Sequence, residues 1–158
     1  MNVRAPSKAT EMPALRRTEA VPASLDIDVD HAIPRLNVVI RGGVTGHQVG
    51  RALAAYYLEH PEVVRIDMLF DLSDYQGAVE AEHVKLILEA YFKCAPDPRV
   101  PCRTAFVTPD KNFRLWAAAM SFQFKGREHQ AFASMDEALA FLAQPIDQRP
   151  PFEAPQPV

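Results

Sequence analysis

Residues 63–77, with the sequence VVRIDMLFDLSDYQG, constrain the fold more than any other stretch of this chain. The even-numbered positions from 66 to 72 are all apolar, and Leu69 on the opposite face is apolar too. A strand covered on both faces is typical of an α/β sheet. We expect Arg65 and Asp67 near the solvated start of this strand, and a polar loop at residues 73–77 after it.

The rest of the chain alternates predicted strands with predicted helices. Residues 25–30 read LDIDVD, a half-exposed strand, and a short turn joins them to a strand at 36–41, which predicts an antiparallel hairpin. Amphipathic periodicity predicts helices from Thr45 to His60 and over about 79–94, 111–122 and 135–142. Further strands are predicted at 102–107 and 127–132, the latter a polar edge. The order ββαβαβαβα predicts an α/β fold with a mixed five-stranded sheet and helices on its faces.

Composition divides the 158 residues into three parts. Residues 1–24 lack periodicity and contain three prolines, which predicts a disordered arm. Residues 25–143 are predicted to form a single domain. Residues 144–158 are rich in proline and predict a loosely packed tail.

Charge and hydropathy bear on several classes of partner. The net charge of −3 disfavours nucleic-acid binding, because phosphate contacts need a basic surface. No apolar run reaches the roughly 20 residues that span a membrane, and the N-terminal segment lacks the apolar core of a secretory signal. We therefore expect a cytoplasmic protein.

No arrangement of residues carries a specific catalytic or metal-binding signature. No two of the five histidines are four residues apart, and none sits at ligand spacing from a cysteine. There is no Gly-x-Ser-x-Gly motif. We expect no metal, no cofactor and no catalytic residue. An enzyme that uses Asp71 or Asp110 as an acid or base is the weakest hypothesis, because no matched partner is evident.

The first candidate binding loop is residues 42–48, GGVTGHQ. Glycine-rich loops before a helix can hold phosphate, which makes Gly43 and Thr45 candidate binding residues. Capping accounts for more of the pattern, since Thr45 and Gln48 form a capping box. The Gly-x-Gly-x-x-Gly and P-loop spacings are absent.

Further candidates follow two other predicted strands. In open α/β sheets, ligands bind beyond the carboxyl ends of the strands. Candidate ligand- or partner-binding residues there are Asp71, Ser73, Asp74, Tyr75 and Asp110. Turn formation and helix capping explain Asp74 and Asp110 more simply.

Two arginines and three aromatic residues have ambiguous surroundings. Arg103 and Arg127 begin strands at the opposite end from that loop, so we expect them to be solvated or paired with acids. Trp116, Phe122 and Phe124 are expected in the core or lining an apolar pocket or contact surface. Phe124, two residues before Gly126, is the one we expect to be most exposed.

Three stretches carry a resemblance to a known family. They are a strand running into Asp71-Leu72, the strand RTAFV at 103–107, and the ending AFASMDEALAFL at 131–142. Over about residues 25–142 the chain resembles the SpoIIAA-like proteins of the STAS superfamily. The resemblance implies a non-catalytic domain used in protein interaction and regulation, or in binding apolar ligands in some relatives.

One departure from the family pattern concerns Ser73. Anti-sigma-factor antagonists carry a phosphorylated serine in Asp-Ser-Ser/Thr-Gly before the second helix, whereas this chain has Asp-Leu-Ser-Asp from Asp71. Ser73 is therefore outside the family's phosphorylation motif, although a serine near a helix N-terminus is a physically sensible place for a phosphoserine switch, so its phosphorylation is left open. The leading hypothesis is a regulatory or protein-interaction domain. The alternative is a binder of a small apolar or nucleotide ligand at the strand ends, and homodimerisation is left open.

Overall fold

The computed structural model describes residues 21–94, 100–124 and 126–146. The predicted arm at 1–24 and the predicted tail at 144–158 lie largely outside these residues. The part of the arm that is described already contains the start of the first strand, at Ser24.

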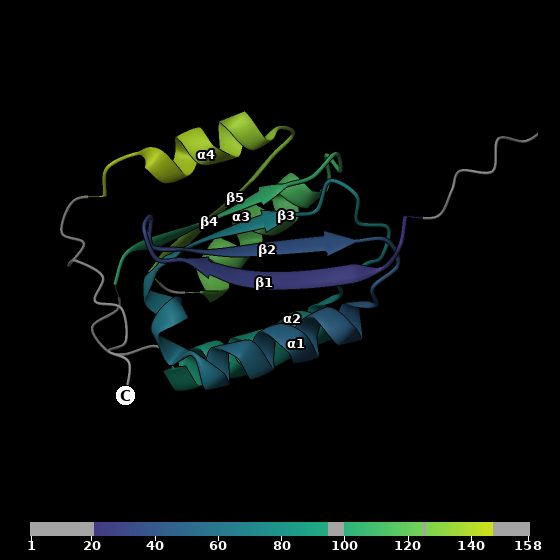
Figure 1. Ribbon diagram of the computed structural model, residues 1–158, viewed down its shortest axis with the longest axis horizontal. Helices are drawn as coiled ribbons and strands as arrows, with labels where there is room; N and C mark the ends of the chain where they lie inside the picture. The colour runs from purple at the N-terminus through teal and green to yellow at the C-terminus, as the bar shows by residue number, and fades with distance from the viewer. Residues whose placement is uncertain (1–20, 95–99, 125, 147–158) are drawn as a thin grey trace, which may run out of the picture.

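Five strands form one mixed sheet, and their order in space is their order along the chain (Figure 1). The sheet confirms the predicted architecture, with an antiparallel N-terminal pair followed by parallel pairs. The strands are β1 (Ser24–Asp30), β2 (Arg35–Arg41), β3 (Asp67–Asp71), β4 (Cys102–Val107) and β5 (Arg127–Phe132).

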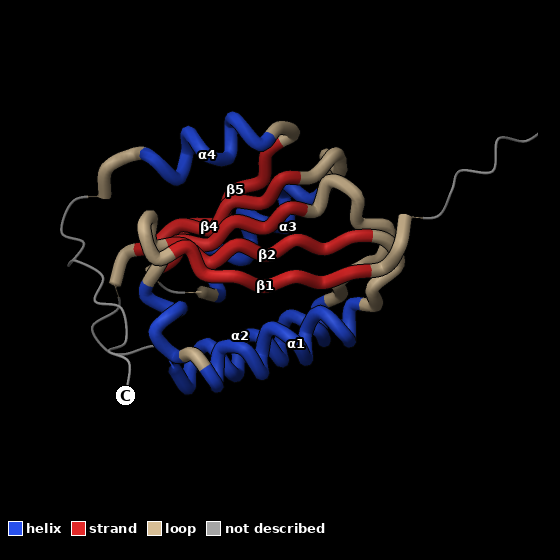
Figure 2. Tube along the Cα trace, viewed as in Figure 1, coloured by secondary structure: helices blue, strands red, loops and turns tan. Residues whose placement is uncertain are grey.

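The helices cover the two faces of the sheet unequally. The helices are α1 (Gly46–Glu59), α2 (Ala81–Cys94), α3 (Phe113–Gln123) and α4 (Met135–Ala143). Helices α1 and α2 pack on each other beneath the sheet, and α4 lies alone on the opposite face (Figure 2). Helix α3 shares the face of α1 and α2, because Ala117 and Met120 belong to the same core as Leu53.

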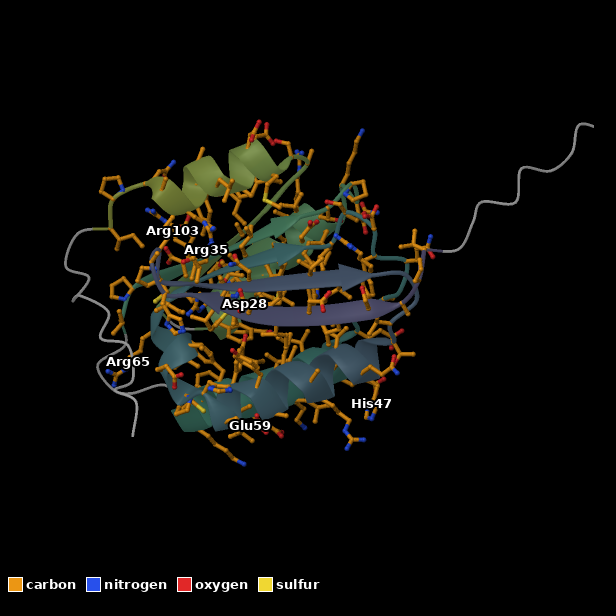
Figure 3. All side chains as sticks on the ribbon, in the orientation of Figure 1. Asp28, Arg35, His47, Glu59, Arg65 and Arg103 are labelled. Atoms are coloured by element: carbon orange, nitrogen blue, oxygen red, sulfur yellow. The ribbon has the colours of Figure 1, made fainter. Side chains whose placement is uncertain are left out.

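Two separate hydrophobic cores result from this arrangement. The larger core lies between the sheet and α1–α3, and side chains fill the layer between the sheet and α1 (Figure 3). The smaller core joins Leu69, Ala105 and Val107 to Phe141 and its neighbours on α4. Strand β3 contributes to both cores, which confirms that this strand is covered on both faces.

Local sequence signals fix the helix starts. The Thr45 hydroxyl accepts a hydrogen bond from the Gln48 amide at 3.1 Å, and the Gln48 side chain accepts one from the Thr45 amide at 2.9 Å. This is the predicted capping box. Ser134 likewise caps α4 by accepting from the Glu137 amide at 3.3 Å.

The central strand is shorter than predicted. Pro61–Arg65 forms a 3₁₀ helix, η1, so β3 begins only at Asp67. Pro61 starts η1 because its fixed φ suits the first turn of a helix. Asp67 is also not solvated as expected: it is buried, and its carboxylate accepts a hydrogen bond from the Arg103 amide at 2.8 Å.

Two glycines bring backbone segments into close contact. Gly42 adopts a φ of 61°, and a β-carbon there would stand 2.4 Å from the Val21 carbonyl oxygen. Gly46 opens α1, where a β-carbon would stand 2.4 Å from both the Ala78 carbonyl oxygen and the His83 Nδ1. Because glycine has no β-carbon, the end of β2 and the starts of α1 and α2 can approach one another at one edge of the sheet.

Candidate functional site

The loops that follow β2 and β3 pair with each other at the carboxyl edge of the sheet. The Gly42 amide donates to the Asp74 carbonyl, and the Gln76 amide donates to the Gly42 carbonyl, both at 2.8 Å. Two of the loops predicted to carry a site are therefore adjacent in space, as expected for neighbouring parallel strands.

Several predicted binding residues form hydrogen bonds that stabilise these loops. Asp71 accepts from the Ser73 amide at 3.0 Å and from the Ser73 hydroxyl at 2.6 Å, an Asx-type turn. Thr45 is the α1 cap, and Gly43 is exposed with no other part of the described chain within 4 Å of its β-carbon position. Asp74 contributes its carbonyl to the loop pairing. None of these five residues lines the cavity described below.

Tyr75 and Asp110 are placed differently, because both line a cavity. The Tyr75 hydroxyl donates to the Val44 carbonyl at 2.9 Å, and burial raises the pKa of this phenol. The Asp110 carboxylate accepts from the Asn112 amide at 2.9 Å at the start of α3. The structure thus brings two of the seven predicted candidates to the wall of one hollow.

That cavity has a volume of about 350 Å³ and lies between the sheet and the helices α1, α2 and α3. Helix α3 packs on β5, and α1 packs on α2, so the cavity lies between α3 on one side and the α1–α2 pair on the other. Most of its wall is apolar. The apolar residues include Leu53 of α1, Val84 and Ile87 of α2, Met68 and Phe70 of β3, and Trp116 and Met120 of α3.

The two ends of the cavity differ in exposure. At the carboxyl edge of the sheet its wall includes the exposed residues Gly77, Ala78, Asp110 and Asn112, and we call this end the mouth. At the amino edge its wall is buried, and we call this the inner end. The lining residues of β4 and its end run from Thr104 through Phe106 to Thr108, a rise of about 13 Å, so the cavity is elongated along the sheet.

Arg127, the first residue of β5, lies at the inner end and is 3% exposed. Its Nη1 donates to the Arg103 carbonyl and the Thr104 hydroxyl, both at 3.2 Å. Its Nη2 donates to the carbonyls of Val64 at 3.0 Å and Ile66 at 2.8 Å. Four of the five guanidinium protons are thereby satisfied, and all four acceptors are uncharged.

The fifth proton of Arg127, on Nε, has no hydrogen-bond partner of ordinary geometry within the described chain, although the Tyr91 side chain also interacts with the guanidinium. The His60–Glu62, His83–Glu82 and Arg103–Glu128 ion pairs do not include Arg127. Burial disfavours the charged form, but Cys102, Tyr91 and Tyr57 outweigh it and raise the pKa of Arg127 above its ordinary value. Arg127 is therefore a permanent buried cation.

His129 lies two residues further along the same face of β5. Its ring stacks 6.0 Å from that of Phe106 and 5.0 Å from that of Phe124, and it lines the cavity. Burial and the Arg127 charge lower the pKa of His129 to about 3, so the imidazole is neutral at pH 7. Its Nδ1 is buried with no hydrogen-bond partner of ordinary geometry among the described residues, although an interaction with the Arg127 backbone partly opposes the lowering of its pKa.

Tyr57 of α1 completes the polar groups of the inner end. Its hydroxyl donates to the Met68 sulfur at 3.3 Å, and a thioether is a weak acceptor. Its ring packs edge-on to Tyr91, which in turn lies beneath the Arg127 guanidinium at 5.8 Å. The inner end is thus an aromatic enclosure around three polar side chains that are incompletely hydrogen-bonded.

The inner end was not anticipated from the sequence. We predicted Arg127 to be solvated or paired with an acid, and that prediction is wrong because η1, α2 and α3 enclose it. Phe124, predicted to be exposed, is 5% exposed and lines the cavity, whereas Phe122 is 86% exposed. A usable signal existed: Arg127, His129 and the apolar Ala131 alternate on one face of β5.

Arg103 is partly as predicted. Its Nε lies 3.8 Å from the Glu128 carboxylate, but its Nη1 also donates to the carbonyls of Phe141 and Gln144 at the end of α4. A cation at a helix C-terminus is favourable. Figure 3 shows Arg103 below α4, on the face of the sheet away from the cavity. Arg103 therefore stabilises α4 and does not belong to the site.

Two searches of the described residues are negative. No group of three or more His, Cys, Asp or Glu side chains gathers there as a metal site would require. None of the helices in the described ranges has the length and apolar character needed to cross a membrane.

Comparisons with known proteins support the fold. No protein-family model matches this chain, and the comparison with curated proteins finds no match. Among solved structures it is similar to an uncharacterized protein of the DUF3478 family from Shewanella loihica PV-4, which has a SpoIIAA-like fold. The two are 16% identical, with a TM-score of 0.51, over 78% of this chain and 94% of the other. The fold is therefore SpoIIAA-like, as the resemblance implied.

Proposed function

We propose that this SpoIIAA-like chain is a non-catalytic binding protein that holds a small apolar molecule in the cavity between the sheet and α1–α3. The cavity carries the proposal. Its volume of about 350 Å³ is within the roughly 300–1,000 Å³ of ligand pockets. Its wall is mostly apolar with a few polar groups, which is the usual composition of such pockets.

The energetics of an apolar hollow support occupancy. An empty cavity of this size would destabilise the fold by several kcal/mol, because the lining atoms lose their packing partners. A ligand that fills the cavity restores those contacts. The open mouth beside Gly77, Ala78 and Asp110 provides a route of access.

The test uses Trp116, the single tryptophan of the chain, as a reporter inside the cavity. We expect its fluorescence to change as an apolar probe such as ANS is titrated, and the melting temperature to rise. Ligand at 100 times its dissociation constant stabilises the folded state by about 2.7 kcal/mol. Native mass spectrometry of protein purified from its source cells would identify the natural occupant.

A cavity-filling variant makes the test specific. Val84→Phe places a ring into the slot from α2, where Val84 is buried, and should weaken probe binding. Leu58→Phe, at a site 53% exposed on α1, is the control and should leave binding unchanged. Equal probe binding by wild type and Val84→Phe would contradict the proposal, since the probe would then bind elsewhere.

The second candidate function is protein interaction, as predicted from the sequence, with a second copy of this chain as the partner. Helix α3 exposes Leu115 at 79% and Phe122 at 86%, with the exposed Ala118 and Ala119 between them. Large side chains flanking small ones form a self-complementary face that can pack on its own two-fold copy.

Sedimentation equilibrium tests this second function. We expect a concentration-dependent dimer that the double variant Leu115→Ser and Phe122→Ser abolishes, while Leu58→Ser on α1 does not. A monomer at every concentration would contradict it. For either function we place the protein in the cytoplasm, because Cys94 and Cys102 are not joined by a disulfide, as is usual in a reducing compartment.

A further inference from the structure

We propose that the ligand is an amphipathic carboxylate, held with its carboxylate at the inner end of the cavity and its apolar chain toward the mouth. This inference rests on the proposed binding function and specifies the class of ligand. It starts from Arg127, whose charge is buried and whose Nε proton lacks a hydrogen-bond partner of ordinary geometry within the described chain.

The charge of the inner end selects an anion. A buried cation is stabilised by a counter-ion that also accepts its hydrogen bonds. The four acceptors that surround the Nη atoms of Arg127 are neutral oxygens, so they orient the guanidinium without neutralising it. Arg127 is thereby positioned rigidly, and a bound carboxylate would supply both the missing charge and an acceptor for Nε.

The neighbouring groups select a carboxylate with one apolar substituent. The Tyr57 hydroxyl has only the Met68 sulfur as an acceptor among the described residues and can donate to a carboxylate oxygen instead. His129 is neutral, so its ring adds a hydrogen-bonding nitrogen without a second charge. One cation therefore faces the ligand, which matches a single negative charge.

The shape of the slot determines the rest of the ligand. Between the inner end and the mouth the wall is lined by aliphatic and aromatic side chains such as Leu53, Ile87, Phe106 and Trp116. An unbranched or flat apolar chain that extends along the strands fits this elongated wall. A nucleotide, with several charges and polar groups along its length, does not.

The experiment compares three probes of one chain length, decanoate, decanol and decylamine, at pH 7. Binding is followed by Trp116 fluorescence and by calorimetry. We expect decanoate to bind at least about tenfold more tightly than decanol, since a hydrogen bond to a charged group is stronger than one between neutral groups. Decylamine should bind most weakly, because its ammonium would face Arg127.

Two variants assign the preference to the inner end. Arg127→Met should abolish the preference for decanoate over decanol, and retained decanol binding would report an intact cavity. Tyr57→Phe, which keeps the ring, should reduce the preference severalfold. Tyr56→Phe is the matched control, because Tyr56 packs against His60 at 4.5 Å and does not line the cavity.

The outcomes separate this inference from the proposed function. Equal affinities for decanoate and decanol in the wild type would overturn the carboxylate inference and leave apolar binding in place. Tighter binding of decylamine would overturn it as well. If none of the three probes nor ANS changes Trp116 fluorescence or stability, both the inference and the proposed function are overturned.

Discussion

The guanidinium Nη2 of Arg127 donates to the Ile66 carbonyl at 2.8 Å. Arg127 begins β5 and Ile66 directly precedes β3, and β4 lies between these two strands. The Arg127 side chain on the edge strand β5 thus extends past β4 and binds the segment that precedes β3. Arg127 does so for Val64 also, at 3.0 Å. The buried cation is therefore a structural connection between β5 and η1 as well as the proposed ligand contact.

Replacing Arg127 with methionine should lower the free energy of unfolding by about 3 kcal/mol. The buried carbonyls of Val64 and Ile66 lose their donor, and each such loss costs about 1–3 kcal/mol. Urea unfolding measures the change. Arg41→Met, at an exposed position at the end of β2, is the control and should change stability by about 0.5 kcal/mol or less. Equal effects of the two substitutions would contradict this structural role.

His129 should make the fold less stable in acid. Its pKa is lowered from 6.5 to about 3 by burial and Arg127, so the unfolded chain binds a proton below pH 6.5 that the folded chain does not. The free energy of unfolding should therefore fall by up to about 1.4 kcal/mol per pH unit between pH 6.5 and 3. Its close neighbours are Arg127 on β5, Phe106 on β4, and Ser121 of α3 with the adjoining Phe124.

The contribution of His129 is isolated by substitution. His129→Phe should reduce the slope of the free energy of unfolding against pH by the amount that corresponds to one bound proton over this range. Substitution of the exposed His31 by asparagine should not reproduce that reduction. Chemical denaturation at several pH values provides the measurement. An unchanged slope in His129→Phe would show that the imidazole is protonated normally in the folded protein.

Tyr57→Phe should alter stability by about 0.5 kcal/mol or less, because the hydroxyl it removes donates only to a weak thioether acceptor. Tyr75→Phe should cost about 1 kcal/mol, because the Tyr75 hydroxyl donates to the Val44 carbonyl at 2.9 Å. Thermal unfolding of both variants compares the two hydroxyls directly. A larger loss for Tyr57→Phe would indicate that its hydroxyl serves the fold and would weaken its assignment to ligand binding.

Gly42→Ala and Gly43→Ala should have opposite effects although the residues are adjacent. At Gly42 the φ of 61° and the 2.4 Å approach to the Val21 carbonyl predict a loss of about 2 kcal/mol or more. At Gly43 no such neighbour lies within 4 Å, so alanine should stabilise by about 0.4–1 kcal/mol through the unfolded state. Denaturant midpoints with unchanged m-values would measure both, and similar losses at the two sites would refute this difference.

The architecture could be predicted from the sequence because its signals are local. The alternation in LDIDVD specifies an edge strand, and Thr45 with Gln48 specifies the start of a helix. Each of these patterns acts within a few residues, so tertiary context did not override it. The η1 turn was missed because the apolar Val63 and Val64 suit a strand as well as a buried 3₁₀ turn.

The inner end of the site was missed, although the alternation of Arg127, His129 and Ala131 was a usable signal, because burial there depends on distant elements. Arg127 is enclosed by η1, α2 and α3, which are separated from it in sequence, and an arginine at a strand start is usually solvated. The exposure of Phe124 was also mispredicted. Helix α3 ends at Gln123, so Phe124 is not on the exposed face that carries Phe122, and its ring packs against His129. Asp71 ends β3 and Ser73 follows it at the carboxyl edge of the sheet, but their hydrogen bonds to each other were not anticipated.

The identity of strand order and chain order has a consequence for how the sheet is assembled. Each strand pairs with the one synthesised immediately before it, so no strand has to insert between two that are already joined. A chain emerging from the ribosome can therefore extend the sheet one strand at a time, and β5 comes last. Because Arg127 belongs to β5, its charge can be fully buried only after β5 has joined the sheet.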